Sequence, residues 1–116
     1  MSLFKQSLEN HAVAARLVDL LLERGNPVSV WDSEEETVID STDRAEILEA
    51  LATTDQDEIC AGGFVFLLVW DASGDELISD YSYPLGRLAE ADEIYKQANA
   101  AIEALRNKIS GAARTI

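Results

Sequence analysis

The sequence predicts an α+β fold, in which an antiparallel sheet of four or five strands packs with two long helices and one short helix. Both ends of the chain repeat apolar residues at helical spacing, whereas the middle alternates short β-branched runs with turn residues. Short connections favour neighbouring antiparallel strands over parallel crossovers. The chain of 116 residues has the size of one domain, which we assign to residues 1–110, with a frayed tail over 111–116.

Residues 3–24 are predicted to form the first long helix. Apolar residues and one histidine recur there at spacings of three and four, which gives one buried stripe. Gly25 follows as a C-terminal stop. The stripe consists of Phe4, Leu8, His11, Ala15, Val18 and Leu22, and Leu17 and Leu21 widen it.

A hairpin and a short helix come next. Residues 27–31 and 36–40 are rich in β-branched side chains and read as two strands, joined by the acidic loop 32–35. The short helix is predicted over 43–52, because Asp43 stands at capping-box spacing from the glutamate three residues later.

The middle of the chain predicts the remaining strands. Residues 58–61 and 64–70 flank a Gly-Gly turn, and the second run is apolar on both faces, which indicates an interior position in the sheet. The loop 71–75 then turns the chain into a strand over 76–80.

The second long helix is predicted over 85–109. Its stripe serves either to pack on the chain's own sheet or to join two copies in a homodimer through the Leu88–Ile109 helix. The stripe consists of Leu88, Ala91, Tyr95, Ala98, Ile102, Leu105 and Ile109.

The charge is concentrated in the middle of the chain. Eighteen of the 22 acidic residues lie between Asp32 and Glu93, where only Arg44 and Arg87 are basic, so this stretch carries a formal charge of −16. Such a field repels nucleic acid and anionic membranes and attracts basic protein surfaces. We therefore expect a basic, nucleic-acid-binding protein as the partner, and neither direct nucleic-acid binding nor membrane binding.

The residues needed for common catalytic sites are scarce. His11 and Cys60 are the only histidine and the only cysteine, so a zinc site and an internal disulfide are excluded, and no nucleophile motif is present. We expect no enzyme activity and no cofactor, although a carboxylate-only metal hydrolase stays open as a third option. A lone cysteine suits a reducing compartment, and we expect the bacterial host cytoplasm.

The clustered carboxylates have two interpretations, a solubilising surface or a binding surface for a basic partner. Acids two apart on a strand or three apart on a helix repeat at about 5–7 Å and could imitate a phosphate row. The tryptophans are core residues or, if exposed, aromatic anchors for a partner. The candidate partner-binding residues are Glu34, Glu35, Glu36, Asp43, Glu46, Glu49, Asp55, Asp57, Glu58, Asp71, Asp75, Glu76, Trp31 and Trp70.

Residues 28–83 resemble small acidic proteins encoded by tailed phages and prophages. The resemblance rests on four pieces of sequence: Ser41-Thr42-Asp43, Ile47-Leu48-Glu49-Ala50-Leu51, Thr54-Asp55-Gln56-Asp57 and Ile78-Ser79-Asp80-Tyr81. Phage proteins of this size and charge include inhibitors of host defence, among them anti-CRISPR proteins that act as DNA mimics. The resemblance therefore implies a non-enzymatic inhibitor that blocks a nucleic-acid-binding groove. The alternative from the stripe of the last helix is a small homodimeric phage structural or accessory protein.

Overall fold

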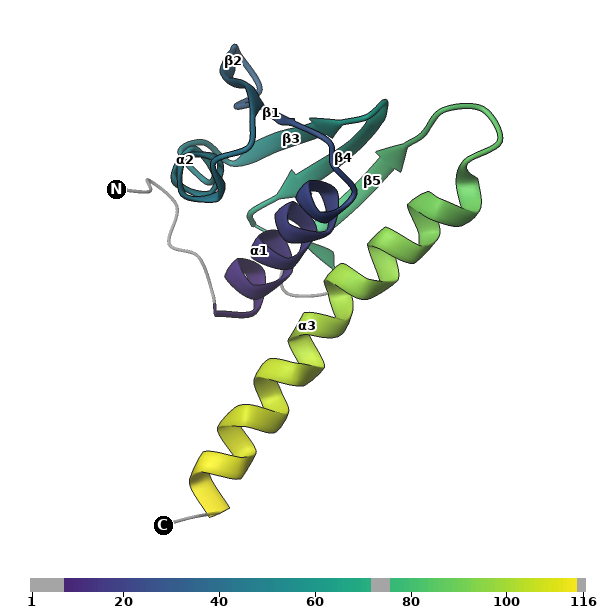
Figure 1. Ribbon diagram of the computed structural model, residues 1–116. Helices are drawn as coiled ribbons and strands as arrows, with labels where there is room; N and C mark the ends of the chain where they lie inside the picture. The colour runs from purple at the N-terminus through teal and green to yellow at the C-terminus, as the bar shows by residue number, and fades with distance from the viewer. Residues whose placement is uncertain (1–7, 72–75, 115–116) are drawn as a thin grey trace.

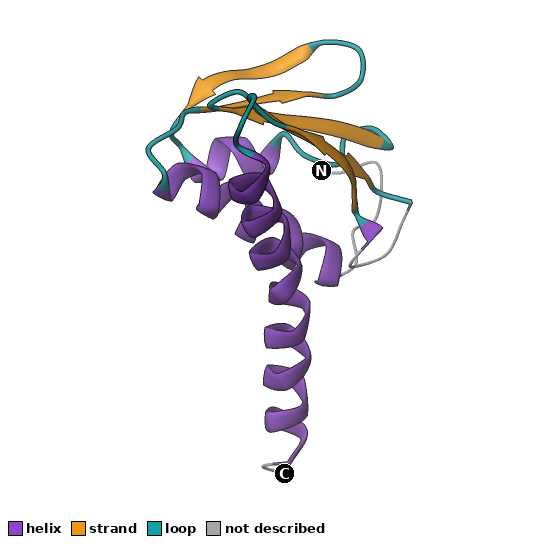
Figure 2. Ribbon diagram, turned by 90° about the vertical axis from the view of Figure 1, so that its right-hand side faces the viewer, coloured by secondary structure: helices purple, strands orange, loops and turns teal. Residues whose placement is uncertain are grey.

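The structure, a computed structural model that describes residues 8–71 and 76–114, confirms the α+β class. Five antiparallel strands form one sheet in the order β2-β1-β3-β4-β5, and the helices lie on one of its faces (Figures 1 and 2). The elements are α1 (Leu8–Glu23), β1 (Val28–Trp31), β2 (Glu36–Ser41), α2 (Arg44–Glu49), β3 (Gln56–Ala61), β4 (Phe64–Val69), β5 (Ile78–Ser82) and α3 (Leu88–Arg114).

Helix α1 confirms the predicted helix and most of its buried stripe, since Ala15 and Val18 are buried, but not the N-terminal part of the stripe, where Leu8 is exposed. Leu17 and Leu21 are fully buried, whereas His11 is exposed. The reason is that α1 packs against α3, α2 and β1 together, so its buried face is wider than a stripe of every third or fourth residue and is rotated away from His11. Gly25 adopts a φ of +81° and ends the helix as predicted. Phe4 lies outside the described residues.

The β1–β2 hairpin is followed by a crossover that the sequence did not predict. Strands β2 and β3 both pair with β1 in antiparallel fashion, so they are parallel to each other. The chain therefore passes across β1 between them, and the six-residue helix α2 lies in this connection. Connection length alone favoured β2 and β3 as direct neighbours, because a crossover through so short a helix is uncommon.

The cap of α2 is formed by two side chains. Asp43 accepts hydrogen bonds from the backbone N–H groups two and three residues ahead, as predicted. The N–H of Asp43 donates to the Ser41 hydroxyl at 3.1 Å, so Ser41 takes the place that the capping box assigns to Glu46. Arg44, the first residue of α2, is exposed and pairs with Asp19 of α1 at 2.6 Å.

Strand β4 takes an interior position in the sheet, as its composition predicted. Phe64, Phe66 and Leu68 are fully buried beneath the helices. The side chains that alternate with them, at 65, 67 and 69, point to the opposite face and are only partly buried. No described helix covers that face (Figure 2), so half of this apolar strand borders an open surface.

Helix α3 is displaced from its predicted bounds at both ends. It begins at Leu88, because Gly86 has a φ of +82° that a right-handed helix cannot include. It continues through Gly111 to Arg114, which lies within the segment 111–116 that we predicted as a frayed tail. The alanines that follow Gly111 are the strongest helix formers and offset the cost of about 1 kcal/mol that a glycine imposes.

The predicted stripe of α3 is largely used within the chain. Ala91, Ala98 and Ile102 are buried and α3 packs on α1, while Leu88 is 48% exposed. The C-terminal half of α3 extends beyond the sheet (Figure 1). Because packing on α1 explains the buried stripe, the homodimer through this helix stays a prediction without a structural contact to support it.

Tyr81 joins the edge strand β5 to α3. Its hydroxyl donates a hydrogen bond to the Asp92 carboxylate, which raises the pKa of Tyr81 to about 12. Its ring stacks on Phe66 at 5.8 Å and on Tyr95 at 5.3 Å, measured between centroids. The tyrosine therefore anchors α3 to the sheet by both a polar and an aromatic contact.

We expect Tyr81→Phe to lower the free energy of unfolding by about 1–2 kcal/mol, because the Asp92 carboxylate loses its hydrogen-bond donor while the stacked ring is kept. Urea unfolding followed by circular dichroism measures this loss. Tyr83→Phe is the matched control, since the Tyr83 side chain is 40% exposed. Equal losses in the two variants would show that the Tyr81–Asp92 bond does not stabilise the fold.

Candidate protein-binding surface

The antiparallel pairing brings three acidic loops to the same end of the sheet. β1 and β4 end there, and β2, β3 and β5 begin there. The Thr54 hydroxyl donates to the carbonyl oxygen of Asp32 at 2.7 Å, and the Trp70 N–H donates to that of Asp55 at 3.0 Å, so hydrogen bonds join the loops. We call the described acids of these loops the acidic end; they are Asp32, Glu34, Glu35, Asp55, Asp71 and Glu76.

The hairpin loop of the acidic end is held by its own first residue. The Asp32 carboxylate accepts hydrogen bonds from the N–H groups of Glu35 at 2.9 Å and Glu34 at 3.0 Å, and these bonds lower the pKa of Asp32. The N–H of Asp32 in turn donates to the Glu35 carbonyl at 3.0 Å. Both glutamate side chains are exposed, so a fixed backbone presents two carboxylates to solvent.

A row of five side chains crosses the open face of the sheet. Residues directly opposite each other on antiparallel strands share a face, and the register links one such residue on every strand. Neighbouring positions are about 4.8 Å apart, the separation of the strands. We call this set the open-face row; from β2 to β5 it runs Glu36, Trp31, Glu58, Leu67 and Asp80.

The open-face row alternates carboxylates with apolar side chains. Trp31 is 41% exposed between two glutamates, and Leu67 is half-buried between Glu58 and Asp80. Trp31 and Glu36 directly flank the loop 32–35, so the row begins at the acidic end.

Beside the row lies a shallow hollow of about 200 Å³, whose lining combines apolar and acidic residues. Val65 and Leu67 supply its apolar floor, and Glu58 and Asp80 supply carboxylates. Cys60 lies opposite Val65 on the same face, and burial, then the charges of Glu58 and Glu36, raises the pKa of its thiol. The cysteine is therefore a protonated, half-buried member of this surface and not an activated nucleophile.

The carboxylates of this surface have no cationic partner among the described residues. In every salt bridge between described residues, the acidic residue belongs to helix α1 or helix α3. The acids that pair are Glu9, Asp19, Glu23 and Glu90. The helical layer thus neutralises part of its own charge, while the acidic end and the open-face row neutralise none of theirs.

Two of the predicted partner-binding residues are in the core, which corrects their assignment. Asp57 is 1% exposed and Trp70 is 6% exposed. The indole Nε1–H of Trp70 and the backbone N–H of Ala52 both donate to Asp57 Oδ2 at 2.7 Å. Asp57 points to the helical face because it lies next in sequence to Glu58, which occupies the open face.

The acids of α2 are not part of the same surface. Glu46 and Glu49 are exposed, but α2 packs against α1 on the helix-covered side of the sheet. Asp43 is occupied as the N-cap of that helix. Asp75 lies outside the described residues.

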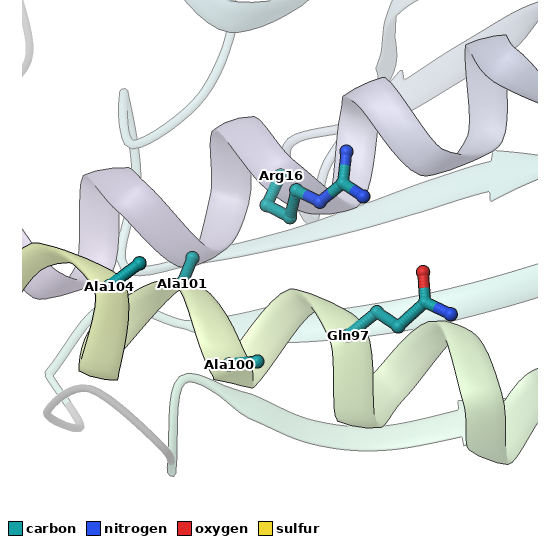
Figure 3. Close-up of a pocket in the computed structure, with 5 residues that line it drawn as sticks. All are labelled: Arg16, Gln97, Ala100, Ala101 and Ala104. Carbon is teal, nitrogen blue, oxygen red and sulfur yellow. The ribbon is translucent and has the colours of Figure 1, made fainter.

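A second concave feature lies between α1 and α3 (Figure 3). It measures about 370 Å³ and is lined by Arg16, Gln97 and the small residues Ala100, Ala101 and Ala104. No predicted partner-binding residue borders it.

No protein-family model, no curated protein and no solved structure matches this chain. Over residues 8–71 and 76–114, no three His, Cys, Asp or Glu side chains are grouped so as to hold a metal ion. No helix in the described part of the chain has both the length and the apolar character needed to cross a bilayer.

The sequence missed two members of the open-face row, Leu67 and Asp80. The sequence did contain a signal for both residues. Residues 64–69 are apolar on both faces of the strand, and Asp80 lies in the next predicted strand, 76–80. The pairing register that places them beside Glu58 and Trp31 follows from the tertiary structure alone.

We expect Asp57 to make the fold more stable as the pH falls. Burial raises the pKa of Asp57 to about 6, above the value of 3.8 in the unfolded chain, so the folded state binds the proton more tightly. The gain begins as the pH falls through about 6 and is complete below about 4, and reaches about 3 kcal/mol.

Asp57→Asn isolates this effect, because an amide keeps an acceptor for Trp70 and carries no charge. We expect the variant to be at least as stable as the native protein at about pH 7 and to lose that advantage at about pH 4.5. Urea unfolding at both values measures the difference, and a difference that is independent of pH would contradict the assignment.

Proposed function

We propose that this protein is a non-enzymatic inhibitor that binds a basic, nucleic-acid-binding surface through its acidic end and open-face row. The target class that we propose is a host defence complex, in particular a CRISPR effector, in keeping with the resemblance to acidic phage proteins. The observation that supports it most is the continuity of an unpaired acidic surface with an exposed tryptophan on an uncovered sheet face.

The charge of the surface suits a cationic groove. The acidic end and the row together hold nine carboxylates, and the salt bridges of the described residues use none of them. Holding like charges together opposes folding, and a cationic partner removes that repulsion on binding. The same field accelerates encounter with a basic groove at low salt.

The apolar side chains of the open face argue against a purely solubilising role. A surface that only keeps a protein dispersed is served best by charge without exposed aromatic residues. Here Trp31 and Leu67 stand between the carboxylates, and Val65 widens the apolar area. Tryptophan in such a setting is the residue type most enriched among those that dominate binding energy.

The proposed mechanism is competition for cations. Lysine and arginine side chains that otherwise contact phosphate would pair with the carboxylates of the acidic end, while Trp31 is buried against the groove wall. DNA loading is then blocked without any chemical step. Such a complex weakens as salt rises, less steeply where the apolar contacts contribute.

We expect the triple variant Glu34→Lys/Glu35→Lys/Glu36→Lys to lose at least about tenfold in inhibition, because three like-charge contacts replace three attractive ones. The measurement begins with capture of the target from a bacterial host lysate at low and high salt, identified by mass spectrometry. DNA binding by the purified target is then titrated with the native protein and the variant.

The control variant carries the same charge change on the helical layer, at Glu23, Glu93 and Glu103, all of which are exposed. It should inhibit as well as the native protein. Equal losses of inhibition in the two variants would show that the effect depends on net charge alone and not on the acidic end. Capture of nothing but the bait would contradict the proposed inhibitor role in that host.

A further inference from the structure

We propose that the open-face row binds a basic amphipathic α-helix of the partner, laid across the strands. This inference rests on the proposed function and specifies the element of the target that is blocked. The helix presents arginine or lysine to Glu36, Glu58 and Asp80, and apolar side chains to Trp31 and Leu67.

The spacing of the row matches one face of a helix. Successive positions of the row lie at about 0, 4.8, 9.6, 14.4 and 19.2 Å, the separations of five strands. Helix positions i, i+3, i+7, i+10 and i+14 share a face and rise by about 0, 4.5, 10.5, 15 and 21 Å. Basic residues at i, i+7 and i+14 therefore meet the three carboxylates, and apolar residues at i+3 and i+10 meet the two apolar members.

An extended segment fits the row poorly. Its same-side residues repeat at about 6.8 Å, so it falls out of step with a row of about 4.8 Å after one residue. The twist between strands turns the ends of the row away from each other, and the long flexible side chains of lysine and arginine can follow it.

The edges of the sheet also disfavour strand addition. On β5 the Asp80 carboxylate accepts the backbone N–H of Tyr81 at 2.8 Å, which occupies a donor that an added strand needs. On β2 the pairing with β1 is irregular and Asp40 has a φ of +46°, so this edge departs from a regular strand. Both edges are therefore blunted, and the face is the surface left for a partner.

Charge complementarity selects a basic partner over another copy of this chain. The row holds three carboxylates and no cation, so its match is a helix with cations spaced by seven. Helix α3 of a second copy does not fit, since the residue seven positions after Lys96 is the acidic Glu103, and Arg106 already pairs with Glu9 at 2.8 Å.

The test uses synthetic, end-blocked peptides and the full chain. The aligned peptide carries arginine at i, i+7 and i+14, leucine at i+3 and i+10, and alanine and glutamine elsewhere. A permuted peptide has the same composition and helicity with its arginines on three faces, and a third peptide has central prolines that prevent a helix. Fluorescence anisotropy gives the Kd of each, and amide chemical shifts locate the contact.

We expect the aligned peptide to bind at least about tenfold more tightly than the other two, with shifts on the open face. Trp31→Ala should weaken it about tenfold and Glu58→Gln about threefold. The matched control Glu49→Gln, on the exposed surface of α2, should leave the Kd unchanged.

Equal affinity for the aligned and permuted peptides, tighter binding of the proline peptide, or no binding of any peptide at low salt would overturn the helix assignment. Such a result together with salt-dependent capture of a DNA-binding target leaves the proposed function intact. The converse result, a preference for the aligned peptide without any captured target, removes the defence-complex role and keeps the helix-binding face.

Discussion

The covering of only one face of the sheet is the constraint on which the rest of the structure depends. Three helices lie on the same side, where α1 packs on α3, on α2 and on β1. Phe64, Phe66 and Leu68 complete the core under that layer. An antiparallel sheet tolerates one solvated face, but an apolar strand such as β4 then brings half of its side chains to that face. The open surface is a direct consequence of where the helices lie.

Charge follows the same division into two layers. The three acids of α1 and Glu90 of α3 pair with arginines, while the loops and the open face carry carboxylates without cations among the described residues. The uneven distribution opposes folding through repulsion at one end of the sheet. The hydrogen bonds that Asp32 accepts within its loop, and the bonds that link the loops, hold that end together.

Asp57 is the point at which the acidic end meets the core. It receives hydrogen bonds from the end of β4, through Trp70, and from the segment after α2, through Ala52. Ala52 has a φ of +61°, so the buried carboxylate also secures a left-handed turn of a non-glycine residue. Its Oδ1 atom is buried without a hydrogen-bond partner among the described residues, which is consistent with a raised pKa. In the sequence Asp57 looks like the other acidic residues around it, but in the fold its carboxylate has a structural role.

The sequence by itself determined the α+β class, the order of the elements and the interior position of β4, because these follow from periodicity, turn residues and composition. It also determined the acidic loops, since a run such as Asp32–Glu35 can only be solvated. It did not determine how wide the buried face of α1 is or that α2 crosses over β1, because both depend on which elements become neighbours. The tertiary structure alone decided that Asp57 is buried while Glu58 is exposed, and that Trp31, Leu67 and Asp80 join one row. The reason is that a one-residue change in strand register moves every side chain to the other face, and only the packed sheet sets that register.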